Sequence, residues 1–348
     1  MEILITGGAG FIGSHLAERL LGEGHRVVAL DDLSTGSLDN LCAAFDYPGF
    51  GFVQGSVLEV ARVARLIERS DLVVHLAAAV GVRYVLDHPI ETIKTNVHGT
   101  DNILEAATQF GKKVLMASTS EIYGKNTADA LCESADSILG PATISRWSYA
   151  TTKKIDEFLA LAYAESYHLP VVITRFFNIV GPRQAGRYGM VLPSFARAAL
   201  AGEPIRVFGD GRQTRNFTFI EDCVEALVRL LFTDSAEGAV FNIGGPHEIS
   251  IMELAGRVKE ITGSASPILL VPYAKAYQGM SFEDMRRRVP CICKIQRLTG
   301  WSPQTTIDEM IRRTVQYECR PSRRGLDAAA EPQWKGLVKQ DQLESASA

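Results

Sequence analysis

The chain has 348 residues, of which 46% are hydrophobic and 22% charged, and its formal net charge is −4. This globular composition, long enough for one large domain or two, lacks the basic excess of proteins that bind nucleic acid or membrane surfaces. No apolar run approaches the roughly 20 residues that cross a bilayer, so we expect a cytoplasmic protein with neither kind of partner.

Short apolar segments alternate with amphipathic segments through the first half of the chain. The expected strands are 2–6, 26–30, 72–75, 113–117 and 171–174, and the expected helices are 11–23, 59–69, 90–110 and 146–167. Strands that alternate with helices are typical of a parallel, doubly wound α/β sheet. The sequence therefore predicts a Rossmann-type fold, whose nucleotide site lies where the strand order reverses.

After about residue 180 the segments become shorter and richer in Gly and Pro. We expect an NAD-binding domain over 1–180, to which 216–243 return with a helix at 221–232. A smaller, discontinuous α/β domain that binds substrate is expected over 181–215 and 244–318. Residues 319–348 are expected to form a flexible tail.

A glycine-rich loop lies between the first strand and the first helix. Gly7, Gly10 and Gly13 suit a tight turn, close approach to a pyrophosphate and tight helix packing. The second strand ends at Asp31, placed to accept the ribose hydroxyls of a dinucleotide, and with Asp32 it disfavours a 2′-phosphate. The pattern predicts NAD as the cofactor, although a purely structural glycine turn can look similar.

Tyr149 and Lys153 are four residues apart in the expected helix 146–167 and so share one face. A cation beside a phenol lowers the pKa of the phenol, which is about 10 unperturbed. A tyrosine of this kind can remove a proton from a sugar hydroxyl while hydride leaves the same carbon. A Tyr and a Lys at this spacing are common by chance. The dinucleotide loop that precedes them in the chain makes the pair a specific indication of catalysis.

These motifs resemble the extended short-chain dehydrogenase/reductase family of nucleotide-sugar enzymes over roughly residues 1–318. The resemblance rests on 6–13, on Leu76-Ala77-Ala78, on Tyr149 with Lys153 and on 175–178. It implies a UDP-sugar substrate and homodimers formed through helices 90–110 and 146–167. The expected NAD contacts are Gly7, Gly10, Phe11, Ile12, Gly13, Asp31, Asp32, Ser34, Thr35, Gly36, Ser56, Val57, Leu76, Ala77, Ala78, Asn96, Tyr149 and Lys153.

The segment 118–124 separates the branches of this family. Its Thr119-Ser120-Glu121 is similar to the UDP-glucuronate decarboxylases, including UDP-xylose synthases, whereas 4,6-dehydratases carry Thr-Asp-Glu. Oxidation at C4 of a glucuronate gives a β-keto acid, which loses CO2 when the resulting enolate is stabilised. Thr119 is expected at the C4 oxygen, with Ser120 and Glu121 facing C5 and the carboxylate. Glu121 is expected to orient that carboxylate or relay a proton, unless it is only structural.

Five further residues are expected to bind the substrate. Arg215 matches the family arginine that meets the sugar or diphosphate, Asn178 matches a diphosphate contact, and Arg288 matches a second diphosphate-binding arginine. Arg83 and Arg183 are candidates for the sugar carboxylate. The Pro-Asp that is usual in the decarboxylases is replaced here by Pro290-Cys291, and the loop 79–83 looks more like that of some uronate epimerases.

The six cysteines are Cys42, Cys132, Cys223, Cys291, Cys293 and Cys319. Their spacing fits neither a Cys-x-x-Cys pair nor a set of metal ligands, so we expect reduced thiols and no metal site.

UDP-glucuronate decarboxylation, to UDP-xylose or a UDP-4-keto-pentose, is therefore the leading interpretation. A UDP-glucose or UDP-glucuronate 4-epimerase is favoured by the loop 79–83 and disfavoured by Glu121. A 4,6-dehydratase is disfavoured because Ser120 stands where an acid is needed. A non-catalytic NAD-binding regulator is disfavoured by the intact Tyr149 and Lys153.

Overall fold

The computed structural model of the chain describes residues 1–184, 190–276 and 283–319, except for the side chains of Val82 and Arg83. The predicted tail, apart from Cys319, therefore lies outside the described residues. Within these ranges, none of the helices combines the length and apolar character that a bilayer crossing requires.

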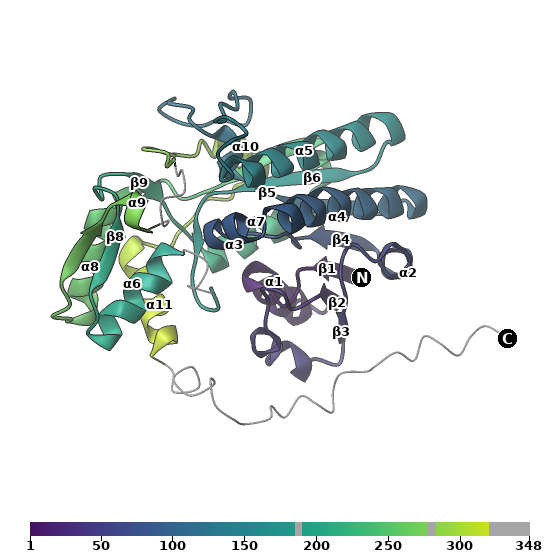
Figure 1. Cartoon of the computed structure of the whole chain (residues 1–348). Helices are drawn as coiled ribbons and strands as arrows, with labels where there is room; N and C mark the ends of the chain where they lie inside the picture. Colours follow the sequence, from purple (N-terminus) through teal and green to yellow (C-terminus); the bar gives the residue numbers. More distant parts are fainter. Residues whose placement is uncertain (185–189, 277–282, 320–348) are drawn as a thin grey trace.

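A seven-stranded parallel sheet forms the centre of the molecule (Figure 1). Its order is β11-β6-β5-β4-β1-β2-β3, and every neighbouring pair is parallel. The strands are β1 (Glu2–Thr6), β2 (Arg26–Asp31), β3 (Phe50–Gln54), β4 (Leu72–His75), β5 (Lys113–Thr119), β6 (Val171–Phe176) and β11 (Ala239–Ile243). The order reverses at β1, which lies between β2 and β4, so the crevice at its carboxyl end is the expected nucleotide site.

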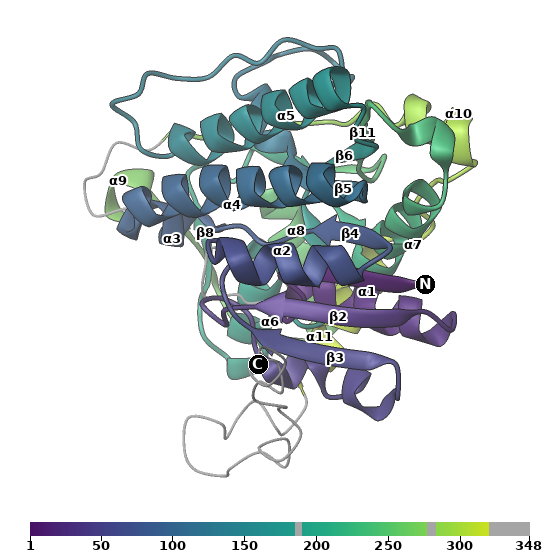
Figure 2. The same cartoon turned by 90° about the vertical axis from the view of Figure 1, so that its right-hand side faces the viewer.

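Helices cover both faces of this sheet, as Figure 2 shows. One face carries α2 (Val60–Arg69), α4 (Pro89–Phe110) and α5 (Trp147–Tyr167), which lie side by side, and the other carries α1 (Phe11–Gly22) and α7 (Ile220–Leu231). Successive strand residues point to opposite faces, so Ile3 and Ile5 join the core beneath α1 while Leu4 joins the core beneath α4. The predicted doubly wound α/β fold is confirmed.

A smaller group of elements packs beyond the carboxyl ends of the strands. It contains α6 (Val191–Ala201), α8 (Ile251–Thr262) and α11 (Ile307–Glu318), together with the two-stranded pairs β8 (Ile205–Phe208) with β13 (Ile268–Val271) and β9 (Thr214–Asn216) with β12 (Glu248–Ser250). Short elements complete the path: α3 (Val82–Asp87), β7 (Ile179–Val180), β10 (Thr218–Phe219), α9 (Tyr273–Ala276) and α10 (Cys293–Thr299). The domain boundaries stay a prediction, although α7 and β11 do lie with the main sheet.

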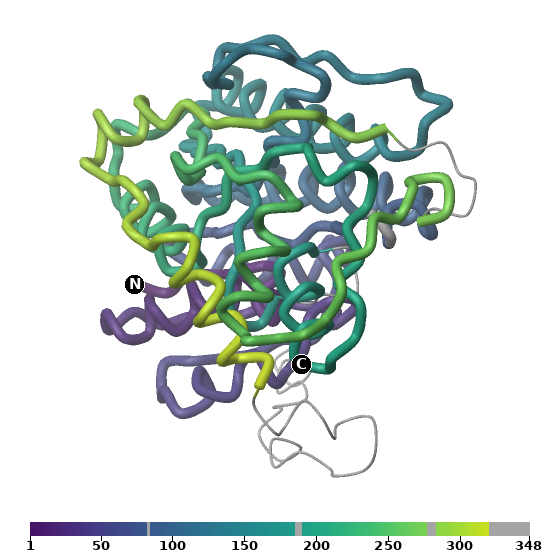
Figure 3. The backbone as a smooth tube through the Cα atoms, turned by 90° about the vertical axis from the view of Figure 1, so that its left-hand side faces the viewer, coloured from purple at the N-terminus to yellow at the C-terminus, as the bar shows by residue number. Residues whose placement is uncertain are grey.

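Two segments far apart in sequence run together near the carboxyl end of β5. The chain after η3 (Ser120–Tyr123) forms a long excursion to α5, and the segment leading into α10 passes beside it (Figure 3). Leu131 pairs with Pro290 in a parallel bridge, and Leu131 donates its N–H to the Val289 carbonyl at 2.8 Å. This contact carries residues 284–288 towards the end of β5.

Candidate active site

The glycine loop after β1 is packed so closely that only glycine fits at two positions. Gly7 has φ +70°, and a Cβ there would lie 2.8 Å from the Ala77 nitrogen. A Cβ on Gly13 would collide with the Gly7 carbonyl oxygen. The loop therefore lies flat on the end of β4, and α1 begins directly after it at Phe11 with unpaired N–H groups that suit an anion.

Asp31, the last residue of β2, forms the far wall of this crevice. Its carboxylate accepts the N–H of Ala9 at 3.0 Å and that of Leu33 at 2.8 Å. Burial is the largest influence on this carboxyl and raises its pKa. A Cβ on Gly36 would lie 2.9 Å from Asp31 Oδ1, so glycine keeps a recess open beside the carboxylate. This cradle fits the adenosine half of a dinucleotide, as the sequence predicted.

The remaining expected cofactor residues follow the ends of β2, β3 and β4. Ser34 donates its N–H to Asp32 Oδ1 at 2.9 Å, and Ser56 donates its N–H to Glu59 ahead of α2. Asn96, on α4, contacts the loop 76–81 through its side chain. Its amide accepts the Ala79 N–H at 2.8 Å and donates to Thr152 at 3.2 Å, so its observed contacts tie the loop to α5.

Tyr149 and Lys153 lie on the first turns of α5, under the end of β5. The phenol of Tyr149 bonds to the Thr119 hydroxyl. The Lys153 ammonium donates to Asp156 Oδ2 at 3.1 Å. The expectation of a lowered phenol pKa is wrong for this structure, because burial first and the Glu121 charge next raise the pKa of Tyr149.

Glu121 lies just beyond β5 and is held by two arginines. Arg146, the residue that precedes α5, donates to Glu121 Oε2 at 3.0 Å, and Arg288 donates to Glu121 Oε1 at 2.5 Å. Burial alone would raise the pKa of Glu121, but the charges of Arg146 and Arg288 outweigh it and lower that pKa to about 2. Glu121 is thus an ionised carboxylate inside a cationic site.

Arg215 and Asp284 extend this cluster towards the smaller group of elements. Arg215 Nη2 donates to Asp284 Oδ1 at 2.7 Å, and Arg146 lies 3.6 Å from the same oxygen. The three arginines are almost fully buried, and their short ion pairs within the cluster are with Glu121 and Asp284, while the charge of Glu283 also acts on Arg146. The arrangement is suited to an additional anionic group.

The structure also separates the consecutive arginines 286–288. Arg286 pairs with Asp210 and Arg287 with Glu248, both near the surface. Arg288 is buried and donates to Asn178 Oδ1 at 3.0 Å as well as to Glu121. Its Nε is buried without a hydrogen-bond partner among the described residues, so one donor remains for a ligand.

The other two expected substrate residues have different positions. Arg183, with φ +70°, donates to Glu18 of α1 at 2.7 Å, so its observed partner belongs to the cofactor helix. The side chain of Arg83 lies outside the described residues. Ser120 is buried beside Glu121 at the start of η3.

Sequence reasoning did not nominate Arg146, Asp284 or Asp156 as site residues. Arg146 precedes Tyr149 by three residues on the same helical turn, and this spacing was a usable signal. Asp156 follows Lys153 at the same spacing. Asp284 carried no local signal, because its role depends on a segment that reaches Arg215 only in the folded chain.

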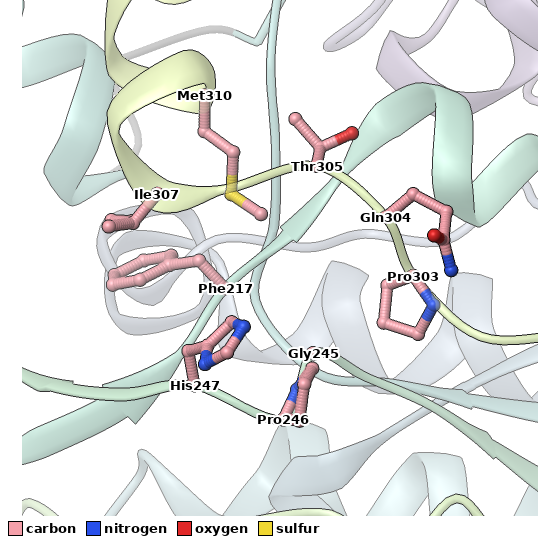
Figure 4. A pocket seen from close by; sticks show the side chains of 9 residues that line it. All are labelled: Phe217, Gly245, Pro246, His247, Pro303, Gln304, Thr305, Ile307 and Met310. Carbon is pink, nitrogen blue, oxygen red and sulfur yellow. The ribbon is translucent and has the colours of Figure 1, made fainter.

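A small and a larger cavity occur among the described residues. A hollow of about 30 Å³ between Phe217, His247 and Met310 is about large enough for one water, and it does not include the arginine cluster (Figure 4). A larger cavity of about 320 Å³ is lined by Gly209, Asp210, Gln213, Tyr273, Asp284, Met285 and Arg286. It shares Asp284 with the cluster, so it continues the site towards β8.

Residues 3–244 match the profile of the NAD dependent epimerase/dehydratase family. The chain is 41% identical over 318 residues to a UDP-N-acetyl-alpha-D-glucosaminuronate decarboxylase of Bacillus cytotoxicus, covering 90% of this chain and 96% of that protein. It is 34% identical to UDP-glucuronic acid decarboxylase 1 of Xenopus tropicalis, covering 91% of this chain and 72% of that one.

Solved structures agree in fold. The UDP-glucuronic acid 4-epimerase of Bacillus cereus, in complex with UDP-glucuronic acid and NAD, is 30% identical with a TM-score of 0.82 and covers 91% of this chain and 98% of that one. With the glycine loop, the Asp31 cradle and the Tyr149 site, these matches show that the chain belongs to the NAD dependent epimerase/dehydratase family.

Proposed function

We propose that this enzyme oxidises C4 of a UDP-linked glucuronate and then releases the sugar carboxylate as CO2. The observation that carries the proposal is the buried set of Arg146, Arg215 and Arg288 around Glu121, immediately beside Tyr149. A uronate supplies a carboxylate that this set of guanidinium groups can bind in addition to the diphosphate. The decarboxylases at 41% and 34% identity support the same reaction.

The first step requires a base at the C4 hydroxyl. NAD, when bound, supplies the acceptor for the hydride that leaves C4. Tyr149 takes the hydroxyl proton, and Thr119, already bonded to the phenol, orients the C4 oxygen. Because the pKa of Tyr149 is raised in the structure, proton removal needs positive charge near the phenol. Arg288 acts in this direction, and Lys153, four residues further along α5, is proposed to add to it.

The second step breaks the bond between C5 and the carboxylate. The electron pair stays on C5 and delocalises into the C4 ketone as an enolate, which Tyr149 and Thr119 stabilise as donors. Glu121 starts ionised, so in this proposal it holds Arg146 at the departing carboxylate and does not donate a proton. Ser120, buried beside it, faces C5.

The nucleotide lies beyond the arginines in this proposal. Arg215, Arg288 and Asn178 bind the diphosphate, and the 320 Å³ cavity next to Asp284 holds the nucleoside. Arg183 is assigned to the cofactor side, because its partner Glu18 belongs to α1. Arg83 remains a proposed contact of the sugar carboxylate.

We further propose that the enzyme is a cytoplasmic homodimer formed through α4 and α5. These neighbouring helices carry exposed apolar side chains, namely Ile90, Ile93, Ile155, Phe158 and Tyr167. Phe158 is 64% exposed on α5, and together with the other apolar side chains it offers a surface that a second copy can cover. All six cysteines are free thiols, consistent with a reducing compartment.

Incubation with UDP-glucuronate and, separately, with its 2-acetamido analogue tests the reaction and the substituent at C2. We expect one of the two to lose CO2 in the presence of NAD. The second candidate function, 4-epimerisation, is favoured by the likeness to the UDP-glucuronic acid 4-epimerase, and it would return a UDP-uronate of unchanged mass.

A further inference from the structure

Three thiols from two separate segments of the chain lie close together outside the arginine cluster. Cys132 lies in the excursion after η3, and Cys291 and Cys293 lie at the start of α10. The thiol of Cys291 bonds to those of both Cys132 and Cys293. Among the described residues no group of His, Cys, Asp and Glu side chains is arranged to hold a metal ion.

The backbone fixes Cys132 and Cys291 as neighbours. Leu131 and Pro290 form a parallel bridge, and Cys291 donates its N–H to the Leu131 carbonyl at 3.0 Å. The side-chain amide of Asn242, which is fully buried, donates to the carbonyls of Leu131 at 2.8 Å and Cys291 at 3.0 Å. Side chains one residue further along both segments are therefore held at the separation of adjacent strands, which a disulfide can span with a small adjustment.

The local environment favours Cys291 as the reactive member. Burial acts to raise the pKa of this thiol, but hydrogen bonds from the Cys293 N–H and from the two neighbouring thiols outweigh it and lower the pKa. Cys132 and Cys291 are half-buried and Cys293 is exposed, so a small oxidant can reach the group. Cys223, in contrast, is fully buried in α7.

We propose that Cys291 and Cys132 form an oxidation site that closes reversibly to a disulfide when a peroxide is present. The Cys291 thiolate attacks one peroxide oxygen, breaks the O–O bond and becomes a sulfenic acid while water leaves. The Cys132 sulfur then attacks that sulfur, and the hydroxyl departs as a second water. Two thiols lose two electrons and two protons, and one peroxide is reduced to two waters.

Closure of this bond joins the excursion after η3 to the segment that carries Arg288. Arg288 lies three residues before Cys291 and reaches back to Glu121. The bond therefore fixes the backbone from which this arginine enters the site. The oxidation itself does not depend on the proposed reaction, so it can be tested without any turnover.

The test treats the purified full-length chain with a small excess of hydrogen peroxide, blocks remaining thiols with N-ethylmaleimide in denaturant and maps tryptic peptides by mass. We expect a peptide pair joined through Cys132 and Cys291, loss of two blocked thiols and full recovery after dithiothreitol. Cys132→Ser should instead leave a sulfenic acid on Cys291 that dimedone captures, and Cys291→Ser should abolish the cross-link. Cys42→Ser, which removes an exposed thiol elsewhere, is the matched control and should cross-link like the wild type.

Three results would overturn the proposal. The first is oxidation spread over the exposed Cys42, Cys293 and Cys319 with no preference for Cys291. The second is a Cys291–Cys293 bond in place of the cross-segment bond. The third is a cross-link that persists in Cys291→Ser.

Discussion

The Lys153 ammonium donates a hydrogen bond to the Asp156 carboxylate at 3.1 Å, one turn along α5, and both side chains are almost completely buried. The charge expected to activate Tyr149 is therefore partly compensated by a carboxylate of the same helix. Asp156 is also among the groups that raise the pKa of Tyr149, after burial and Glu121. The Asp156 charge therefore contributes to how readily the phenol gives up its proton.

Replacing Asp156 by Asn should make Tyr149 more acidic, because the substitution removes one negative charge and keeps the side-chain shape. The phenolate form is needed for C4 oxidation, so the rate of NADH formation rises with pH through the apparent pKa of Tyr149. We expect Asp156→Asn to move this profile to lower pH. Asp101→Asn, at a carboxylate on α4 that binds Tyr163, is the control. Identical profiles in wild type and Asp156→Asn would assign Asp156 a purely structural role.

Tyr149→Phe should abolish C4 oxidation and leave UDP-sugar binding intact. Loss of a general base typically lowers the rate 10²–10⁴-fold, and the phenyl ring still fills the same buried space. Stopped-flow NADH absorbance measures the rate, and calorimetry measures binding. Tyr163→Phe removes a phenol hydroxyl from the same helix and should retain activity. Turnover at the wild-type rate in Tyr149→Phe is incompatible with the assigned base.

Glu121→Gln should lower stability at neutral pH and alter its pH dependence. The pKa of Glu121 is lowered to about 2, so its ionised form adds stability above the ordinary value of 4.5, and that stability is lost as pH falls towards 2. Urea unfolding from pH 7 to pH 3 should show the wild type more stable at neutral pH, with the difference shrinking below about 4.5. Glu68→Gln, at an exposed position of α2, should show no such trend. A constant difference across this range would contradict the ion pairs with Arg146 and Arg288.

Phe158→Glu should convert the proposed dimer into a monomer. The side chain is 64% exposed on α5, and a charge there cannot be buried against a second copy without a large desolvation cost. Sedimentation velocity measures the mass, and circular dichroism checks that the fold is retained. Phe232→Glu, at an exposed phenylalanine just after α7, is the control. A wild-type protein that sediments as a monomer would contradict the proposed interface.

The sequence was most informative where function imposes a local pattern. Gly7, Gly13 and Asp31 lie in one βαβ unit, so their spacing alone predicted the cradle that the structure contains. β3 escaped prediction because Gly51 interrupts a short apolar run that alone does not distinguish strand from turn. β11 was not predicted, because its five residues pair with β6 only after the chain has passed through the smaller group of elements.

The electrostatic part of the site was less predictable than its residue types. Lys153 and Tyr149 have the expected spacing, but burial and the Glu121 charge, with a smaller contribution from Asp156, reverse the expected direction of the phenol pKa. Glu121 was found by its motif, whereas its ionised state follows from two arginines that come from positions 25 and 167 residues away. Such long-range pairing has no signature in a single sequence.

A single-turnover reaction tests the central claim most directly. The enzyme with bound NAD is mixed with limiting UDP-glucuronate or its 2-acetamido analogue, and NADH absorbance is followed together with product mass. The account predicts that NADH forms first and that the nucleotide sugar then loses the mass of CO2, with Glu121→Gln slowing only the second event. Formation of an epimeric UDP-uronate that retains its carboxylate, with no CO2 released from either substrate, would contradict it.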